Sequence, residues 1–176
     1  MPMEFQSAFI SKRWRPACLA LLVVALLVVF GFSGQSGDAS GLLSRQITTE
    51  LVDSLLGGKP VSPSPEFEGL HLVVRKLAHA AEYGLLAFAC ALTLLTFPLP
   101  LAARNGISAG FCFLCACTDE YLQSKSGSRS GRFTDVLIDM CGVLLVLVVL
   151  YLLHRVVIRR RAQRAEPHAS CDSRGA

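Results

Sequence analysis

The segment Ala17–Phe32, with the sequence ACLALLVVALLVVFGF, contains no charged residue. A second uncharged segment, Val143–Leu153 (VLLVLVVLYLL), lies toward the other end of the chain. Segments of this kind are typical of helices that lie in lipid. Of the 176 residues, 52% are hydrophobic and only 17% are charged. In soluble domains about a quarter of the residues are charged. The sequence therefore predicts an integral membrane protein and argues against a soluble enzyme fold.

The pattern of apolar runs predicts an all-α, polytopic membrane protein with a bundle of four transmembrane helices. The predicted helices span residues 17–34, 70–97, 105–123 and 133–158. Pro98 and Pro100 end the second helix, and a tight turn through Ala102 to Gly106 leads to the third. A basic flank before the first helix also fits a signal peptide, but Ser33–Gly37 lacks a small-x-small cleavage pattern, which favours a retained helix.

The loop 35–69 is predicted to contain an extra amphipathic helix over residues 40–56, on the membrane surface or over the bundle. Its apolar residues recur every fourth position, at Leu43, Ile47, Leu51 and Leu55. The domain spans residues 17–158, between a short N-terminal segment, 1–16, and a basic tail, 159–176.

The distribution of Lys and Arg predicts the orientation. With four helices, ten of the 17 basic residues fall on the side of both termini and seven on the other side, in longer loops. Basic residues near membrane ends favour the cytoplasm. We therefore expect a multi-pass protein of the plasma membrane with both termini cytoplasmic. The basic tail then meets anionic lipid, so the net charge of +4 requires no nucleic acid partner.

Three cysteines form a CxxCxC pattern at Cys112, Cys115 and Cys117. This pattern is compatible with a soft-metal or redox site, but such a site needs further ligands of the right geometry. Cysteine also packs as a small apolar residue in membrane helices. We favour packing.

Ionisable residues gather near the predicted outer ends of three helices. In the second helix, Arg75, His79 and Glu82 share one helical face. Charged groups at this depth are costly unless they pair or meet water, so they indicate a functional site. The cluster has four cations and five carboxylates, and this near balance also allows a purely structural network of ion pairs. The candidate ligand-binding residues are Lys76, His79, Glu82, Tyr83, Asp119, Glu120, Gln123, Arg129, Arg132, Asp135 and Asp139.

Three blocks of the cluster resemble a known family. They are KxxHxxEY at Lys76–Tyr83, DExxQ at Asp119–Gln123 and RSGxxxDVxxDxxG at Arg129–Gly142. In this order and spacing they are similar to the signature blocks of the VanZ-like membrane proteins, and FGFSGQSGDAS after the first helix resembles that family's FSSQ-type exit. The likeness covers about residues 30–153. One departure is Ser124–Ser128, where the family usually has an aromatic residue and Pro-Gly before the arginine.

The resemblance implies a small helical membrane protein whose namesake is associated with low-level resistance to the glycopeptide teicoplanin. Our first hypothesis is an outward-facing site that binds or handles a cell-envelope group, either a lipid-linked cell-wall intermediate or a glycopeptide. Arg129, Arg132 and Lys76 would bind phosphate or carboxylate, with Gln123 and Tyr83 as neutral donors.

Two other functions stay open. The chain would be a membrane-embedded hydrolase or transferase on a lipid headgroup if His79 and Glu82 or Glu120 act as acid and base. No metal is predicted, but under this alternative Asp119, Glu120, Asp135 and Asp139 would be its candidate ligands. The third alternative is a scaffold that docks another membrane protein through residues 40–56. The sequence leaves the cofactor unassigned, and it disfavours transport because the charges lie at one face.

Overall fold

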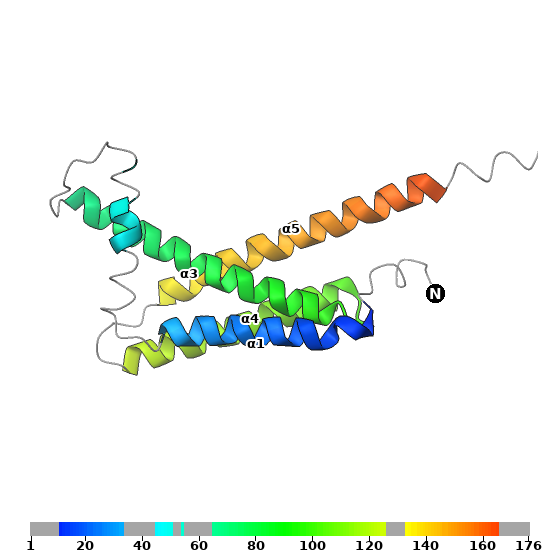
Figure 1. The fold of residues 1–176 in the computed structure, drawn as a ribbon, viewed down its shortest axis with the longest axis horizontal. Coiled ribbons are helices and arrows are strands. Elements are labelled where there is room, and N and C mark those ends of the chain that lie inside the picture. Colours follow the sequence, from blue (N-terminus) through cyan, green and yellow to red (C-terminus); the bar gives the residue numbers. More distant parts are fainter. Residues whose placement is uncertain (1–10, 34–44, 51–53, 55–64, 126–132, 166–176) are drawn as a thin grey trace, which may run out of the picture.

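The computed structural model describes residues 11–33, 45–50, 54, 65–125 and 133–165, and these residues form helices and no strands. Four long helices follow one another in alternating directions (Figure 1). They are α1 (Arg15–Ser33), α3 (Pro65–Leu94), α4 (Leu101–Lys125) and α5 (Phe133–Ala165), and a short 3₁₀ turn, η2 (Lys12–Trp14), precedes α1. All four long helices are long and apolar enough to cross a membrane. The prediction of an all-α protein with four membrane helices is confirmed.

The start of α4 differs from the prediction. The turn expected through Ala102 to Gly106 is helical, because α4 begins at Leu101 rather than near residue 105. Pro100 ends the connection directly before the helix, and the Arg104 amide donates to the Pro100 carbonyl at 3.0 Å. Arg104 therefore lies in the first turn of a helix instead of in a connecting turn.

The other helices also differ from the expected bounds. α1 covers 15–33 instead of 17–34. α3 begins at Pro65 rather than at residue 70, because proline is well suited to the first position of a helix. It ends at Leu94 instead of 97, and single-turn hydrogen bonds through Thr96 and Phe97 follow. α5 starts at the expected residue 133 but continues to Ala165, because Arg, Gln and Ala favour helix.

Part of the expected amphipathic helix 40–56 lies outside the described residues, but 45–50 and 54 are helical. Arg45 Nη2 and Glu68 Oε1 form an ion pair at 3.1 Å, which ties residues 45–50 to the start of α3. Thr48 is fully buried, whereas the apolar Ile47 is about half exposed at 49%. The placement of residues 40–56 on the membrane surface or over the bundle stays a prediction.

α3 and α5 cross at very short range. A Cβ atom at Gly142 of α5 would collide with the backbone of Ala80 in α3. One turn along, a Cβ at Gly84 of α3 would meet Val146 at 3.2 Å. Small residues let membrane helices approach until their backbones touch. The crossing therefore depends on both glycines, and it places Lys76–Tyr83 against the first turns of α5.

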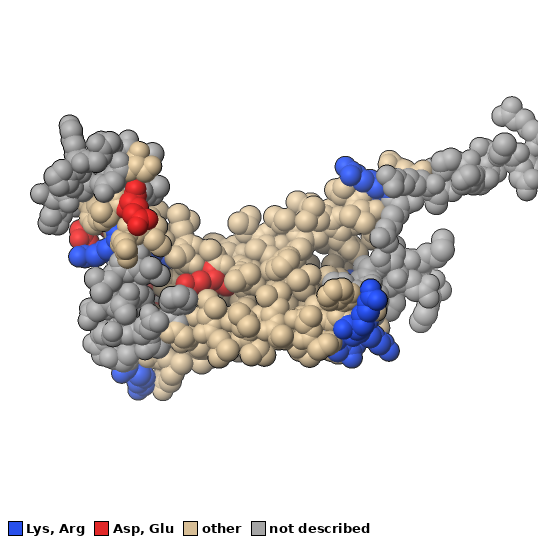
Figure 2. Space-filling model, in the orientation of Figure 1, with Lys and Arg blue, Asp and Glu red and all other residues tan. Residues whose placement is uncertain are grey.

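The two ends of the bundle differ in charge. We call the end that holds Arg15, Thr96 and Arg104 the basic end, and the end that holds Lys76, Asp119 and Asp135 the polar end. In Figure 2 the middle of the visible face carries almost no charge, and blue side chains gather at the basic end. At that end Arg15 donates from Nη2 to the Thr96 carbonyl at 2.9 Å. Its guanidinium also lies 4.2 Å from the centroid of the Phe97 ring, so that α1 is fixed to the end of α3.

Candidate functional site

The α3 contribution to the polar end consists of Lys76, His79, Glu82 and Tyr83. Lys76 Nζ lies 3.6 Å from Asp135 Oδ1 of α5, and both side chains are partly exposed. His79 Nδ1 and Glu82 Oε2 are 3.8 Å apart within α3, and each side chain is about one quarter exposed. Tyr83 is fully buried. The helix therefore presents its charges at the surface and a phenol toward the interior.

The α4 contribution lies on a buried stripe of that helix, formed by Arg104, Ser108, Cys112, Cys115, Ala116, Asp119 and Gln123. At its polar end, Gln123 Nε2 donates to Asp119 Oδ2 at 3.0 Å. Asp119 is only 2% exposed, and it acts electrostatically on His79 and Glu82. Asp119 is thus the carboxylate where the charged groups of α3 and α4 meet.

The α5 contribution is one exposed and one buried carboxylate. Asp135 pairs with Lys76, as described above, whereas Asp139 is 4% exposed. Asp139 interacts electrostatically with carboxylates from all three helices, Asp119, Asp135, Glu120 and Glu82. The structure thus brings together every predicted site residue of α3, α4 and α5. Arg129 and Arg132, the two predicted arginines, lie outside the described residues.

Among the described residues, Oδ1 of Asp139 is buried at the centre of this cluster without a hydrogen bond, and the buried hydroxyl of Tyr83 has Asp119 as its polar neighbour. Both carboxylates, Asp119 and Asp139, act electrostatically on Tyr83. Buried polar groups in folded proteins are nearly always satisfied, and each exception needs an explanation such as a catalytic or binding role. We name the four buried residues Tyr83, Asp119, Gln123 and Asp139 the buried polar core.

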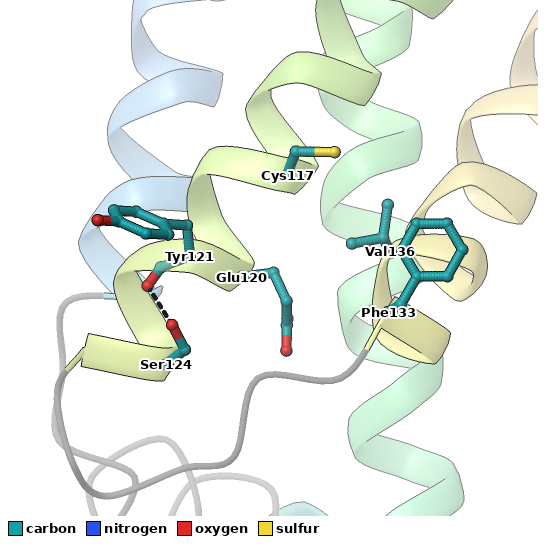
Figure 3. A pocket seen from close by; sticks show the side chains of 6 residues that line it. All are labelled: Cys117, Glu120, Tyr121, Ser124, Phe133 and Val136. Carbon is teal, nitrogen blue, oxygen red and sulfur yellow. Dashed lines mark hydrogen bonds between the residues drawn. The ribbon is translucent and has the colours of Figure 1, made fainter.

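A pocket of about 260 Å³ opens beside this core, between the end of α4 and the start of α5. Its lining is formed by Cys117, Glu120, Tyr121, Ser124, Phe133 and Val136. In Figure 3 the Glu120 side chain extends into the space between the two helices, and Val136 and the Phe133 ring lie across that space on α5. The Tyr121 ring points away toward α1. The pocket therefore offers one carboxylate and one aromatic face.

Sequence reasoning identified Glu120 but missed the rest of this lining. Cys117, Tyr121 and Ser124 follow at i, i+4 and i+7, so a helical projection of α4 would have placed them on one face with Glu120. Phe133 and Val136 carry no charge, and no signal in the sequence separated them from lipid-facing residues of α5.

The cysteines of the CxxCxC pattern do not share one surface. Cys112 is fully buried and Cys115 is 9% exposed in the core, whereas Cys117 lines the pocket. Within the described segments no group of three or more His, Cys, Asp and Glu side chains is close enough to hold a metal ion. The candidate metal ligands Asp119, Glu120, Asp135 and Asp139 thus gain no geometric support from this structure.

Comparison with known proteins agrees with the sequence resemblance. A family model described as VanZ/LLP1 matches residues 18–154. No curated protein and no solved structure matches the chain. The matched region contains the four membrane helices up to His154 of α5 and the whole polar end. The chain therefore belongs to the VanZ/LLP1 family of membrane proteins.

Proposed function

We propose that this protein binds a polar group of a cell-envelope molecule at the polar end of its bundle. The observation that carries the proposal is the buried polar core, in which Oδ1 of Asp139 has no hydrogen bond among the described residues and the buried Tyr83 hydroxyl has only its interaction with Asp119. A fold that needs these residues only for stability would pair those atoms, because an unpaired buried polar group costs about 1–3 kcal/mol. A ligand that supplies the missing partners explains why the cost is tolerated.

The neighbouring pocket supports a ligand with both polar and apolar parts. Glu120 accepts hydrogen bonds from hydroxyl or amino groups, and the Phe133 ring gives a flat apolar surface of the kind that covers a sugar ring or a chain. Lys76 and the sequence-predicted Arg129 and Arg132 are the cations for a phosphate or carboxylate. A lipid-linked cell-wall intermediate has all of these groups, and its lipid tail would lie beside the exposed apolar residues of α5.

The proposal includes an orientation. The basic end carries Lys12, Arg13, Arg15 and Arg104 near the membrane ends of the helices, which favours the cytoplasmic side of the plasma membrane. The polar end and its pocket would then face outward, where envelope intermediates and glycopeptides such as teicoplanin are found. A contribution to teicoplanin resistance follows from this placement and from the family of the chain.

The test replaces Tyr83 with phenylalanine, a change that removes one buried oxygen and keeps the ring. We expect Tyr83→Phe to accumulate in membranes like the parent and to bind a polyprenyl phosphate, the probe, about tenfold more weakly in a native mass spectrometry titration. Tyr151→Phe is the matched control, because Tyr151 is exposed on α5 and contacts only Arg155 among the ring contacts of the described chain. Equal binding by the parent and Tyr83→Phe, or no binding by the parent, would reject the proposal.

The His79–Glu82 pair favours a second candidate, an enzyme that acts on a lipid headgroup. A histidine and a carboxylate 3.8 Å apart and partly exposed are suited to proton transfer once a substrate closes the distance. Turnover of a headgroup by the parent, lost in His79→Gln but retained by His154→Gln, would favour this candidate over binding alone.

A further inference from the structure

The basic end contains a guanidinium whose environment differs from that of every other arginine described above. Arg104 is only 6% exposed, and its Nε atom is buried without a hydrogen bond. Among the described residues no charged group acts on Arg104, whereas Arg75 at the polar end lies in the field of Asp135. Arg104 is thus a buried cation for which the described chain supplies no carboxylate.

Arg15, at the same end of the bundle, is an arginine whose guanidinium has hydrogen-bond partners. Its Nε donates to Thr96 Oγ1 at 3.3 Å and its Nη2 to the Thr96 carbonyl, and the ring of Phe97 covers one face. Among the described residues, Arg104 Nε has no such partner. One turn deeper on the buried stripe, Ser108 is fully buried and interacts with Cys90 of α3. Among the described residues, the Nε atom of Arg104 is therefore the unused polar group of this part of α4.

The carboxylates of the described residues are too far along the bundle to serve Arg104. Glu50, Glu66, Glu68, Glu82, Asp119, Glu120, Asp135 and Asp139 all belong to the polar half, in residues 45–50, in α3, toward the start of α5 or toward the end of α4. Arg104 lies at the opposite end, in the first turn of α4. A buried unpaired charge is strongly destabilising. An anion that the described residues do not supply would remove this cost.

We propose that Arg104 binds a phosphate group at the basic end of the bundle. Guanidinium is the side chain best suited to phosphate, because its nitrogens donate in a planar fork. The first turn of a transmembrane helix also lies at the level of the lipid headgroups, where anionic phosphates are concentrated. A lipid headgroup and a soluble phosphate have the same chemistry, so the experiment separates the two sources.

The experiment uses the full chain in nanodiscs of phosphatidylcholine, with and without phosphatidylglycerol, and with inorganic phosphate as a separate addition. Native mass spectrometry counts the retained phosphatidylglycerol, and thermal unfolding reports stability. We expect the parent to retain phosphatidylglycerol about tenfold more tightly than Arg104→Met does, as loss of a charge-assisted hydrogen bond implies. Arg159→Met is the control, because Arg159 is an exposed arginine toward the end of α5, at the same end of the bundle as Arg104.

The unfolding temperature of Arg104→Met is a second readout, which tests the proposal independently of the binding measurement. Without an anion the substitution removes a buried unpaired charge, so the variant should unfold at the same or a higher temperature than the parent. With phosphatidylglycerol, or with inorganic phosphate if the source is soluble, the order should reverse. Equal retention of phosphatidylglycerol and equal response to phosphate in parent and variant would overturn the proposal. So would a variant that is less stable under all three conditions.

Discussion

Replacing Gly142 with alanine is expected to lower the free energy of unfolding by about 3 kcal/mol, the upper part of the range for overpacked interiors. The added Cβ would collide with the backbone of Ala80, which cannot move aside as a flexible side chain does. α3 and α5 must therefore separate along their crossing. The separation would also pull Lys76 away from Asp135, so the variant should lose ligand binding together with stability.

Gly110→Ala is the matched control for this prediction. Gly110 also lies within a helix, α4, but a Cβ atom there would meet nothing within 4 Å. Because alanine favours helix over glycine by up to about 1 kcal/mol, this variant should be as stable as the parent or slightly more stable. Thermal unfolding in the same detergent compares the two. If Gly142→Ala has the same unfolding temperature as Gly110→Ala, the close crossing of α3 and α5 is wrong.

Replacing Arg15 with leucine is expected to cost about 2–3 kcal/mol of stability. Arg15 donates a charged hydrogen bond to the Thr96 carbonyl and lies over the Phe97 ring, and both contacts link α1 to the end of α3. Hydrogen bonds to charged groups contribute about 1.5–3 kcal/mol, and the cation–π contact adds to this. Among the described residues, α1 then keeps its apolar contacts and the bond from Thr93 Oγ1 to the Cys18 carbonyl.

Arg13→Leu is the control, since Arg13 carries the same charge two residues earlier and is exposed. Its described ring contact is with Trp14 of its own segment, at 5.8 Å, so it joins no two helices. The melting temperature of Arg13→Leu should equal that of the parent. If Arg15→Leu and Arg13→Leu have the same melting temperature, the contact of Arg15 with Thr96 does not hold α1 in place.

The four membrane helices were predictable because their apolar residues form long runs, two of which, Ala17–Phe32 and Val143–Leu153, contain no charge. The helix ends were less predictable, and α4 shows why. Pro98 and Pro100 signal an interruption, but Pro100 serves as the residue before a new helix, so Arg104 enters a helical turn that the sequence pattern assigned to a loop. Its burial depends on how α4 packs, which no local pattern encodes.

The sequence predicted which charged residues belong to the candidate site, but it did not predict which of their side chains are buried. The spacing of Arg75, His79 and Glu82 placed them on one helical face, but only the packing shows that the neighbouring Tyr83 is buried while Lys76 remains partly exposed. Likewise, Asp135 and Asp139 are one turn apart in the sequence, yet Asp135 forms an ion pair and Asp139 is surrounded by carboxylates. Periodicity fixes the face of a helix, whereas burial depends on the neighbouring helix.

The most direct test of a ligand-binding polar end is the unfolding temperature of Asp139→Asn in detergent without ligand, beside the parent and Asp135→Asn. In the described chain the charged groups that act on Asp139 are carboxylates, so its neutral variant should be as stable as the parent or more stable. Asp135→Asn should lose at most about 1 kcal/mol, because its pair with Lys76 is partly exposed. A loss of about 3–5 kcal/mol in Asp139→Asn would show instead that this carboxylate belongs to a structural ion-pair network.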